Sequence, residues 1–501
     1  MMEILGAFAL ILEPYVLAVI LGAGCLGILI GSIPGLTATM GAALLVPITF
    51  FMDPVPAIAA IVTLSAVAVV AGDIPGALLR MPGTPASAAY TLDAHTLVRQ
   101  GRAELALGTS IVCASLGGLL GSVVLVLAAP TLARFALNFS DFEYFWLTCL
   151  GLTCAAFVSP GSTVKGAASL FIGLLIATVG LDVTSGFPRF TFGTTDLMGG
   201  VPLIPAMIGM FAIAEVFRHA VALAPVPHLE QQAVGGLFSG LGKALRPYRW
   251  NILRGGLIGT LIGALPGAGA DIAAWVAYAV SRRFSRTPER FGTGHVEGIC
   301  DAGAANNGSL SGAWVPALVF GIPGDTITAI AIGVLILKGM QPGPAVFINS
   351  PTLLYAVFIS FFVANLLIVP LGWAAVKAAK HVVRVPRSLL MPLILGFCIV
   401  GAFAITNSLL GVQVMLALGL LGYLMEENGL PVAPAILGIV LGGVLEQNFM
   451  TSMLKAQGDL LAFFDRPVAA ALGTVTLLVW ASPLLLRGYR ALAAGQGRKA
   501  E

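Results

Sequence analysis

The chain has 501 residues, of which 58% are hydrophobic and only 10% are charged, and its formal net charge is +3. About a quarter of the residues of a soluble domain are charged, so this composition places most of the chain in a lipid bilayer. The sequence also lacks basic runs interleaved with aromatic residues, which argues against a nucleic-acid partner.

Apolar runs long enough to cross a bilayer recur from one end of the sequence to the other, and each crossing needs roughly 20 such residues. Clear examples are Leu105–Ala129, Phe142–Val158, Pro351–Val376, Gly411–Met425 and Pro467–Leu486. We therefore predict an all-α, polytopic integral membrane protein with about 10–12 transmembrane helices.

The six cysteines and five histidines are scattered, and no pair of them has metal-ligand spacing. We interpret them as small buried side chains and interfacial residues, respectively. The first apolar run, Met1–Ile20, carries Glu3 and Glu13 but no basic residue before it, which favours a true membrane segment over a cleaved signal peptide. The sequence thus predicts no metal site, no cofactor and no catalytic residue.

Basic residues are grouped in a few loops. The groups are Arg99–Arg102, Arg218–Arg254, Arg282–Arg290, Lys377–Arg387 and Arg487–Lys499. The positive-inside rule assigns these loops to the cytoplasmic face. The loops near Asp53 and Glu426–Glu427 lack basic residues and are predicted to face outward.

The sequence repeats itself in two matched elements. Gly27-x3-Gly31-x2-Pro34-Gly35 recurs as Gly259-x3-Gly263-x2-Pro266-Gly267, at an offset of 259 − 27 = 232 residues. Pro82-Gly83-Thr84 corresponds to Pro323-Gly324-Asp325, at an offset of 323 − 82 = 241 residues. A longer loop, Ser281–Gly294, accounts for the nine additional residues in the second copy.

The loop charges of the two copies are reversed. In the first copy the loop after the first Pro-Gly element carries Asp53, and the next is basic at Arg99 and Arg102. In the second copy the first loop, Arg282–Arg290, is basic, and the next, around Lys338, is nearly uncharged. This pattern indicates two inverted repeats, an architecture of many secondary transporters.

The repeats set the predicted domain boundaries. Residues 1–217 form the first membrane repeat, 218–254 a cytoplasmic connecting loop, 255–466 the second repeat, and 467–501 the last transmembrane helix with a cytoplasmic tail. If one transmembrane segment were assigned wrongly, the two copies would have parallel rather than inverted orientations.

The Pro-Gly elements predict broken or re-entrant helices. Proline removes a backbone hydrogen bond and glycine permits unusual backbone angles, so together they interrupt a membrane segment. The exposed backbone groups are tolerated only beside protein or a water-filled cavity. A helix that restarts there directs free N–H groups and its positive dipole end into the cavity, which suits a carboxylate.

The predicted substrate-binding residues lie in or beside these breaks. They are Pro34, Gly35, Thr37, Arg80, Gly83, Thr84, Ser87, Gly267, Asp271, Asn306, Asn307, Gly324, Asp325 and Thr326. Arg80 is the only base near a break in the first copy, and we predict that it pairs with Asp73 or with an anionic substrate. Two simpler readings stay open: the Pro-Gly elements could be ordinary kinks, and Asp73 and Asp301 could be interfacial.

These elements resemble the large membrane subunit of the tripartite tricarboxylate transporters, over essentially the whole chain. The matching motifs are Gly27–Thr37, Ala43–Phe50, Pro82–Ser87, Asp93, Arg99–Arg102, Arg286–Gly294, Ala304–Asn307, Gly321–Gly324, Gln341–Pro344, Leu445–Phe449 and Phe464–Pro467. The resemblance implies a multi-pass permease of the bacterial inner membrane, with a small membrane subunit and a periplasmic solute-binding protein as partners. It also implies uptake of a small carboxylate driven by a Na⁺ or H⁺ gradient rather than by ATP.

Four positions depart from the family pattern. Val70-Ala-Gly-Asp73 stands where an aromatic residue, two glycines and serine are usual, and Arg80 replaces a small polar residue. Gly303 replaces a carboxylate, and Asp271 replaces an uncharged residue. Because they lie in or beside the predicted cavity, these changes bear on which carboxylate or coupling ion is used.

Two other functional classes are alternatives: a channel, and an intramembrane enzyme that acts on a small anionic or lipid substrate. An enzyme would need a nucleophile–base pair, paired carboxylates or a metal cluster within the membrane. No histidine meets a Cys, Ser or Glu at useful helical spacing. A channel would not need inverted halves or a binding protein, so the sequence favours a transporter.

Overall fold

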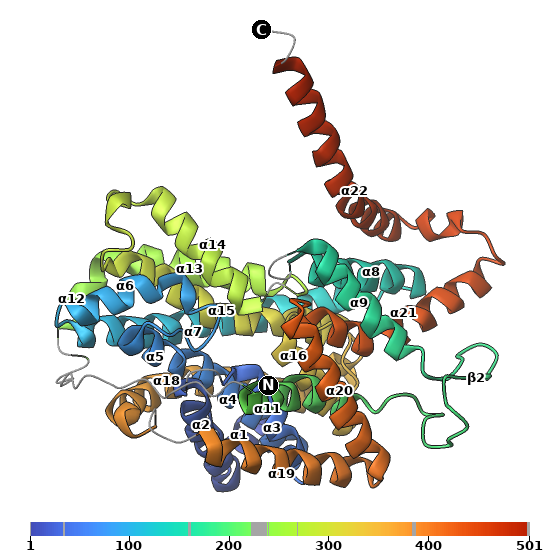
Figure 1. The fold of residues 1–501 in the computed structure, drawn as a ribbon, viewed down its shortest axis with the longest axis horizontal. Helices are drawn as coiled ribbons and strands as arrows, with labels where there is room; N and C mark the ends of the chain where they lie inside the picture. The colour runs from blue at the N-terminus through green and yellow to red at the C-terminus, as the bar shows by residue number, and fades with distance from the viewer. Residues whose placement is uncertain are drawn as a thin grey trace.

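The computed structural model describes residues 2–33, 36–158, 162–221, 238, 240–267, 269–382 and 387–497 (Figure 1). The α-helices are α1 (Met2–Ile11), α2 (Pro14–Ser32), α3 (Ala38–Phe50), α4 (Pro54–Ala71), α5 (Asp73–Leu79), α6 (Ala88–Arg99), α7 (Ala103–Ala136), α8 (Asp141–Val158), α9 (Thr163–Ala177), α10 (Leu203–Ile208), α11 (Ala214–Val221), α12 (Leu241–Leu245), α13 (Arg249–Gly263), α14 (Gly269–Phe284), α15 (Val296–Phe320), α16 (Thr326–Leu337), α17 (Val346–Asn349), α18 (Pro351–Val382), α19 (Arg387–Thr406), α20 (Leu409–Glu427), α21 (Val432–Lys455) and α22 (Pro467–Gly497). The shorter elements are the π-helical turn η1 (Gly209–Ile213), the 3₁₀ turns η2 (Arg246–Tyr248), η3 (Pro288–Arg290) and η4 (Leu461–Phe464), and the strands β1 (Gly180–Leu181) and β2 (Pro188–Arg189).

The helices have the lengths expected of a membrane protein. Within the described chain, seven helical spans are long and apolar enough to cross a bilayer, and five further apolar helices are shorter. This confirms the prediction of an all-α polytopic membrane protein. The 13 residues of α3 and the 12 residues of α16 extend only roughly 18–20 Å at 1.5 Å per residue. Since the hydrocarbon core is about 30 Å thick, these two helices are interrupted segments.

Two helices form the centre of the molecule. Every residue of α4 from Val55 to Ala71 is buried, and so is every residue of α15 from Gly298 to Val319. A helix that is enclosed on all sides needs small or apolar residues around its whole circumference. The buried part of α15 nevertheless contains polar residues, and one of them, Asn306, lines the cavity described below.

The repeated Gly-x3-Gly elements allow close helix packing in both copies. In the first copy, a Cβ atom added to Gly27 would lie 2.8 Å from the carbonyl oxygen of Leu64, and one added to Gly31 would lie 2.2 Å from that of Ala68. In the second copy, a Cβ atom on Gly259 would lie 2.3 Å from the carbonyl oxygen of Ala305, and one on Gly263 would lie 2.2 Å from that of Ser309. The pair Gly31–Ala68 thus recurs as Gly263–Ser309, at offsets of 263 − 31 = 232 and 309 − 68 = 241 residues. These are the two offsets found in the sequence, so the repeated residues make the same contacts twice.

The helix contacts of the two copies also correspond. α2 packs on α4 as α13 packs on α15. α4 packs on α18 while α15 packs on α7, so each copy supplies its longest helix to the centre of the other. In the same way α3 packs on α16, and α14 packs on α6. The two halves are therefore interwoven rather than separate.

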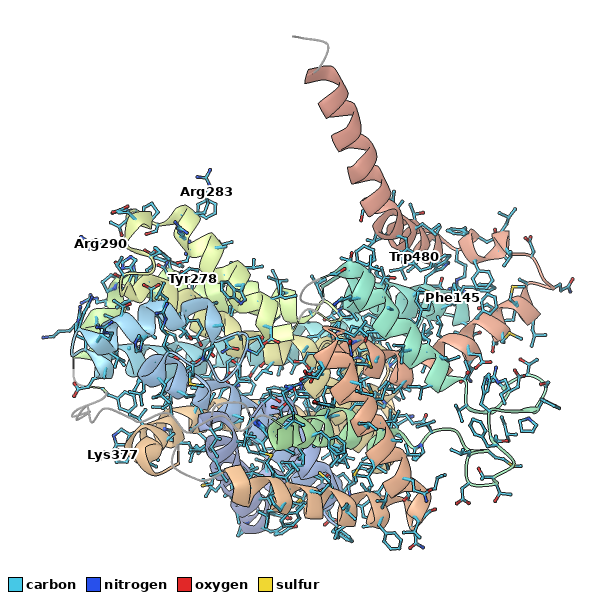
Figure 2. The ribbon with its side chains drawn as sticks, viewed as in Figure 1. Phe145, Tyr278, Arg283, Arg290, Lys377 and Trp480 are labelled. Carbon is cyan, nitrogen blue, oxygen red and sulfur yellow. The ribbon has the colours of Figure 1, made fainter. Side chains whose placement is uncertain are left out.

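Loops from different copies meet in two places. The Nζ atom of Lys338 donates hydrogen bonds to the carbonyl oxygen of Phe50, at 2.8 Å, and to that of Met52, so the end of α3 and the loop after it touch the end of α16. The Nε2 atom of Gln100 donates to the carbonyl oxygen of Thr293 at 3.3 Å, so the loop after α6 touches the loop after α14. Figure 2 shows Arg283, at the end of α14, at the upper left of the view and Lys377 of α18 at the lower left.

A short hairpin of β1 and β2 projects beside α21, at the right of Figure 1. Arg189 donates two hydrogen bonds to the carboxylate of Glu446, at 2.7 and 2.9 Å, which ties the hairpin to α21. Backbone and hydroxyl donors of Ser185, with Arg189 nearby, hold the pKa of Asp182 below its usual value. The tip of the hairpin is therefore ordered by local polar contacts rather than by a core.

Candidate functional site

A cavity of about 320 Å³ lies where the helix breaks of both copies meet. Its walls are built by three helix starts (α3, α14 and α16), the second break of the first copy, α15, and the beginning of α21. Predicted substrate-binding residues account for seven of its lining positions: Thr37, Thr84, Gly267, Asp271, Asn306, Asp325 and Thr326.

Matched capping residues explain why the chain turns at the second break of each copy. Asp325 accepts a hydrogen bond from the backbone N–H of Thr328 at 2.7 Å, and the Thr328 hydroxyl accepts one from the Asp325 N–H at 2.9 Å. Thr84 and Ser87 form the same reciprocal pair, at 3.1 and 3.2 Å. Such capping boxes satisfy free N–H groups at a helix start. The pairs correspond at 325 − 84 = 328 − 87 = 241 residues.

The first break of each copy touches the second break of the other. The Thr39 and Thr326 hydroxyls are 2.9 Å apart. Asp271, at the position that corresponds to Thr39 (271 − 39 = 232), accepts a hydrogen bond from the backbone N–H of Ala86. Elements 287 residues apart in the sequence are therefore neighbours at the cavity.

Four other predicted residues lie behind the lining. Gly83 and Ser87 belong to the turn before α6, and the N–H of Gly83 donates to the carbonyl oxygen of Gly72 at 3.0 Å. Gly324 accepts from the Gly267 N–H at 2.8 Å. Asn307 is buried and its Nδ2 atom donates to Asn365 Oδ1 at 3.2 Å. These residues support the cavity without facing it, whereas Pro34 and Gly35 lie outside the described residues.

Arg80 is not part of the cavity lining. It is exposed and ends α5 with a φ of 57°, in the left-handed region. Asp73 instead accepts hydrogen bonds from Tyr90, at 2.6 Å, and from Ser110. The predicted pairing of Arg80 with Asp73 is therefore wrong, because buried hydroxyls take the place of a base. Tyr90 in turn accepts from Asn306 Nδ2 at 3.3 Å, which links Asp73 to the cavity wall.

The charged residues of the cavity lining are all acidic within the described chain: Asp271, Asp325 and Glu426. Glu426 forms an ion pair with Arg218. Loop charge predicts opposite membrane faces for these two residues, and their ion pair shows that the two predictions cannot both be correct. No ion pair is formed by Asp271 or Asp325 among the described residues.

One wall of the cavity was missed in the sequence analysis. Pro431 and Pro434, at the start of α21, line it together with Phe211 of η1. A third repeat marks this region, because Pro202-x2-Pro205-Ala recurs as Pro431-x2-Pro434-Ala at an offset of 431 − 202 = 229 residues. That repeat was detectable, and it assigns α10–α11 and α21 to corresponding places in the two copies.

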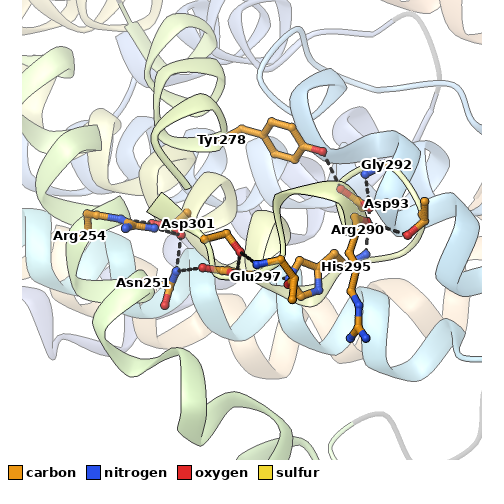
Figure 3. Close-up of polar contacts among 12 residues, drawn as sticks. Asp93, Asn251, Arg254, Tyr278, Arg290, Gly292, His295, Glu297 and Asp301 are labelled. Atoms are coloured by element: carbon orange, nitrogen blue, oxygen red, sulfur yellow. Dashed lines mark hydrogen bonds and ion pairs between the residues drawn. The ribbon is translucent and has the colours of Figure 1, made fainter. Parts of the chain in front are cut away.

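A second polar cluster, away from the cavity, joins the two copies (Figure 3). Asp93 of α6 is fully buried and accepts from the Tyr278 hydroxyl at 2.7 Å. It also accepts from the backbone N–H groups of Gly292, Gly294 and His295 at 2.8–2.9 Å. One carboxylate therefore holds the loop between α14 and α15 against α6.

Asp301 lies in the same region and is also fully buried. Arg254 donates to its two carboxylate oxygens at 3.0 and 2.7 Å, and Asn251 donates at 2.8 Å. Asp301 does not line the cavity. Asp301 is therefore neither a cavity residue nor an exposed interfacial aspartate. It forms an ion pair with Arg254 that joins α13 to α15.

Asp93→Asn is expected to destabilise the protein by about 1.5–3 kcal/mol, because bonds to a charged acceptor are lost or weakened. The amide nitrogen cannot accept from the Tyr278 hydroxyl, and the remaining oxygen is uncharged. Limited trypsin digestion of the purified protein should cut faster at Arg286 and Arg290. Asp465→Asn, at an exposed aspartate outside this cluster, is the control, and equal digestion of both variants would contradict the clamp.

The profile of the tripartite tricarboxylate transporter TctA family matches residues 16–437. The chain belongs to the TctA family. TctA is a transporter family rather than an enzyme family, so this TctA-family chain is a transporter permease component, as the sequence resemblance indicated.

Two relatives of this TctA-family chain come from Agrobacterium vitis. One is an uncharacterized 52.8 kDa protein of the TAR-I ttuC' 3' region, 33% identical over 453 residues that cover 90% of each chain. The other is an uncharacterized protein of the TAR-II ttuC' 3' region, 34% identical over 214 residues that cover 43% of this chain and 88% of the relative. No solved structure matches the chain.

Proposed function

We propose that this TctA-family chain is the large permease subunit of a binding-protein-dependent tripartite transporter in a bacterial inner membrane. It takes up a small carboxylate, driven by a Na⁺ or H⁺ gradient, with a small membrane subunit and a periplasmic solute-binding protein as partners. The observation that carries the proposal is a single cavity whose lining comes from the helix breaks of both copies. Interrupted helices that meet at one site are typical of secondary transporters.

The cavity suits a small anion in size and in backbone chemistry. Its volume of about 320 Å³ is at the lower end of the range of small-molecule sites. The starts of α3, α14 and α16 face it, and each helix start carries a partial positive charge of roughly +0.5. The hydroxyl groups of Thr37 and Thr84 add hydrogen-bond donors that can orient a carboxylate.

The electrostatics of the cavity support ion coupling. Three helix starts together supply about +1.5 charges, whereas Asp271 and Asp325 supply two negative charges without an ion-pair partner in the described chain. A substrate with one or more carboxylates would leave the cavity further negative. Because uncompensated charge is costly inside a membrane, a cation or proton must enter with the substrate.

We also propose that the repeats, residues 1–217 and 255–466, have opposite orientations in the membrane. In parallel copies, the loop after α3 would share a face with the loop after α14. Instead it contacts the end of α16, and the loop after α6 contacts the loop after α14. These exchanged contacts support inverted copies, which allow a cavity at their interface to open to either side in turn.

Reconstitution tests the proposed function against a channel and an intramembrane enzyme. The chain is placed in liposomes with its small membrane subunit, the cognate binding protein is added outside, and uptake of radiolabelled tricarboxylates and dicarboxylates is measured. We expect accumulation that needs both the binding protein and an ion gradient. Equal flux without a gradient would indicate a channel, and chemical conversion of the substrate would indicate an enzyme; either result contradicts the proposal.

A further inference from the structure

We propose that Asp271 and Asp325, with Asn306, form the binding site for the coupling cation, and that this cation is Na⁺. The inference rests on the proposed function, since it assigns the coupling ion to one side of the same cavity. All three residues line that cavity. Two observations support the site: both negative charges belong to the second copy, and one oxygen atom of a lining residue has no hydrogen-bond partner among the described residues.

Both aspartates belong to the second copy. Asp271 occupies the position of Thr39 in the first copy (271 − 39 = 232), and Asp325 the position of Thr84 (325 − 84 = 241). Thr84, the residue that corresponds to Asp325, also has a capping role: its hydroxyl accepts the Ser87 N–H, just as the Asp325 carboxylate accepts the Thr328 N–H at the start of α16. Capping therefore does not require a carboxylate here, and the extra negative charge has another purpose.

The two carboxylates are close enough for their charges to interact. They lie on the first turn of α14 and on the residue before α16, and the Cβ atom of Asp325 would be 3.2 Å from a Cβ built on Gly269. Like charges repel each other more strongly in a low-dielectric site than in water. A bound cation would relieve that repulsion and would be attracted to both carboxylates.

Asn306 supplies an independent indication of a bound ligand. Its side chain is fully buried, and its Oδ1 atom has no hydrogen-bond partner among the described residues. A buried oxygen atom without a partner destabilises the folded protein by about 1–3 kcal/mol. We therefore expect a bound group that interacts with the lone pair of this oxygen. Because the atom assigned as unpartnered is an acceptor, a cation fits it and a carboxylate does not.

The set of ligands favours a monovalent ion. In the described chain no three His, Cys, Asp or Glu residues are grouped as a metal site. Ca²⁺ takes 6–8 oxygen ligands, several of them from carboxylates, and Mg²⁺ requires near-ideal octahedral geometry. The site instead offers two carboxylates and three uncharged groups. The uncharged groups are the Asn306 amide oxygen and the adjacent Thr39 and Thr326 hydroxyls, which are 2.9 Å apart.

This placement divides the cavity between two ligands. With Na⁺ on the side of the second copy, the Thr37 and Thr84 side of the first copy remains for the carboxylate. The bound cation reduces the formal charge of the two aspartates from −2 to −1, and it can contact the substrate directly. Substrate binding and cation binding would then strengthen each other, as coupling requires.

Sodium-dependent thermal stability of the purified, detergent-solubilised chain tests the site without transport. Melting temperatures are measured in NaCl and in choline chloride at equal ionic strength, over a range of Na⁺ concentrations. A ligand that binds only the folded state raises the melting temperature in a concentration-dependent way. We expect this rise in the wild type, and a half-effect concentration at least tenfold higher in Asp271→Asn and Asp325→Asn. Asparagine also caps helices well, so α16 should stay folded.

Asp465→Asn is the matched control and should keep the wild-type response. No Na⁺-specific rise in the wild type, or an unchanged response in both cavity variants, would overturn the site. Stabilisation by lowered pH in place of Na⁺ would also overturn it. Reconstituted uptake distinguishes the cation site from the proposed function. Gradient-driven uptake without Na⁺ binding at Asp271 and Asp325 would refute only the cation site. Na⁺ binding at these residues without gradient-driven uptake would refute only the proposed function.

Discussion

Valine at Gly31 or at Gly263 is expected to abolish assembly of the helical core. A Cβ atom at either position would lie 2.2 Å from a backbone carbonyl oxygen, of Ala68 or of Ser309. Backbone atoms of a buried helix cannot rotate away as a side chain can, so α2 or α13 would have to move off its partner. Small residues at helix interfaces allow this close approach in membranes.

Gly22→Val is the matched control for Gly31→Val, because Gly22 belongs to the same helix and a Cβ atom there meets nothing within 4 Å. Size-exclusion profiles and melting temperatures of the three variants should be compared in detergent. We expect aggregation or loss of a cooperative transition for Gly31→Val and Gly263→Val, and wild-type behaviour for Gly22→Val. A folded, transporting Gly31→Val protein would refute the close contact between α2 and α4.

Arg254→Ala is expected to destabilise the protein by about 3–5 kcal/mol, since it leaves a buried carboxylate without its positive partner. Asp301 is fully buried and would keep Asn251 as an uncharged donor at 2.8 Å but lose its positive partner. Arg254→Lys should recover part of the loss, because lysine restores the charge but cannot reproduce both hydrogen bonds. Thermal unfolding followed by tryptophan fluorescence gives the comparison.

The double variant Arg254→Ala with Asp301→Asn distinguishes charge from packing. Asparagine removes the stranded charge at nearly unchanged volume, so the double variant is expected to be more stable than Arg254→Ala alone. If the two proteins melt at the same temperature, the cost lies in the lost arginine packing and the ion pair contributes little.

Much of the fold could be predicted because repeats and hydrophobic runs are local properties of the sequence. The two offsets, 232 and 241 residues, reappear as matching contacts of Gly31 and Gly263. The third repeat, at Pro202 and Pro431, is also present in the sequence, but one matched pair of prolines among 30 is a weak signal by itself. It would have added α21 to the cavity.

The candidate site was predicted less completely, and the difference has a physical reason. Residues of a helix break can be recognised in sequence, but whether a side chain faces the cavity depends on how far the break turns the chain. Thr84 and Asp325 line the cavity, whereas Ser87 and Gly324 lie directly behind it. Arg80 was selected because its charge is unusual in an apolar segment, yet it ends α5 on the exposed side.

Composition, hydropathy and the repeated motifs by themselves determined that this chain is a helical membrane protein with two related halves, and they resemble one transporter family. Only the tertiary structure decided which polar groups are paired. Asp93, Asp301 and Glu426 each acquire partners from distant segments, whereas Asp271 and Asp325 acquire no ion-pair partner in the described chain. Neutralisation in a membrane depends on neighbours within a few ångströms, and those neighbours are set by the packing of helices hundreds of residues apart.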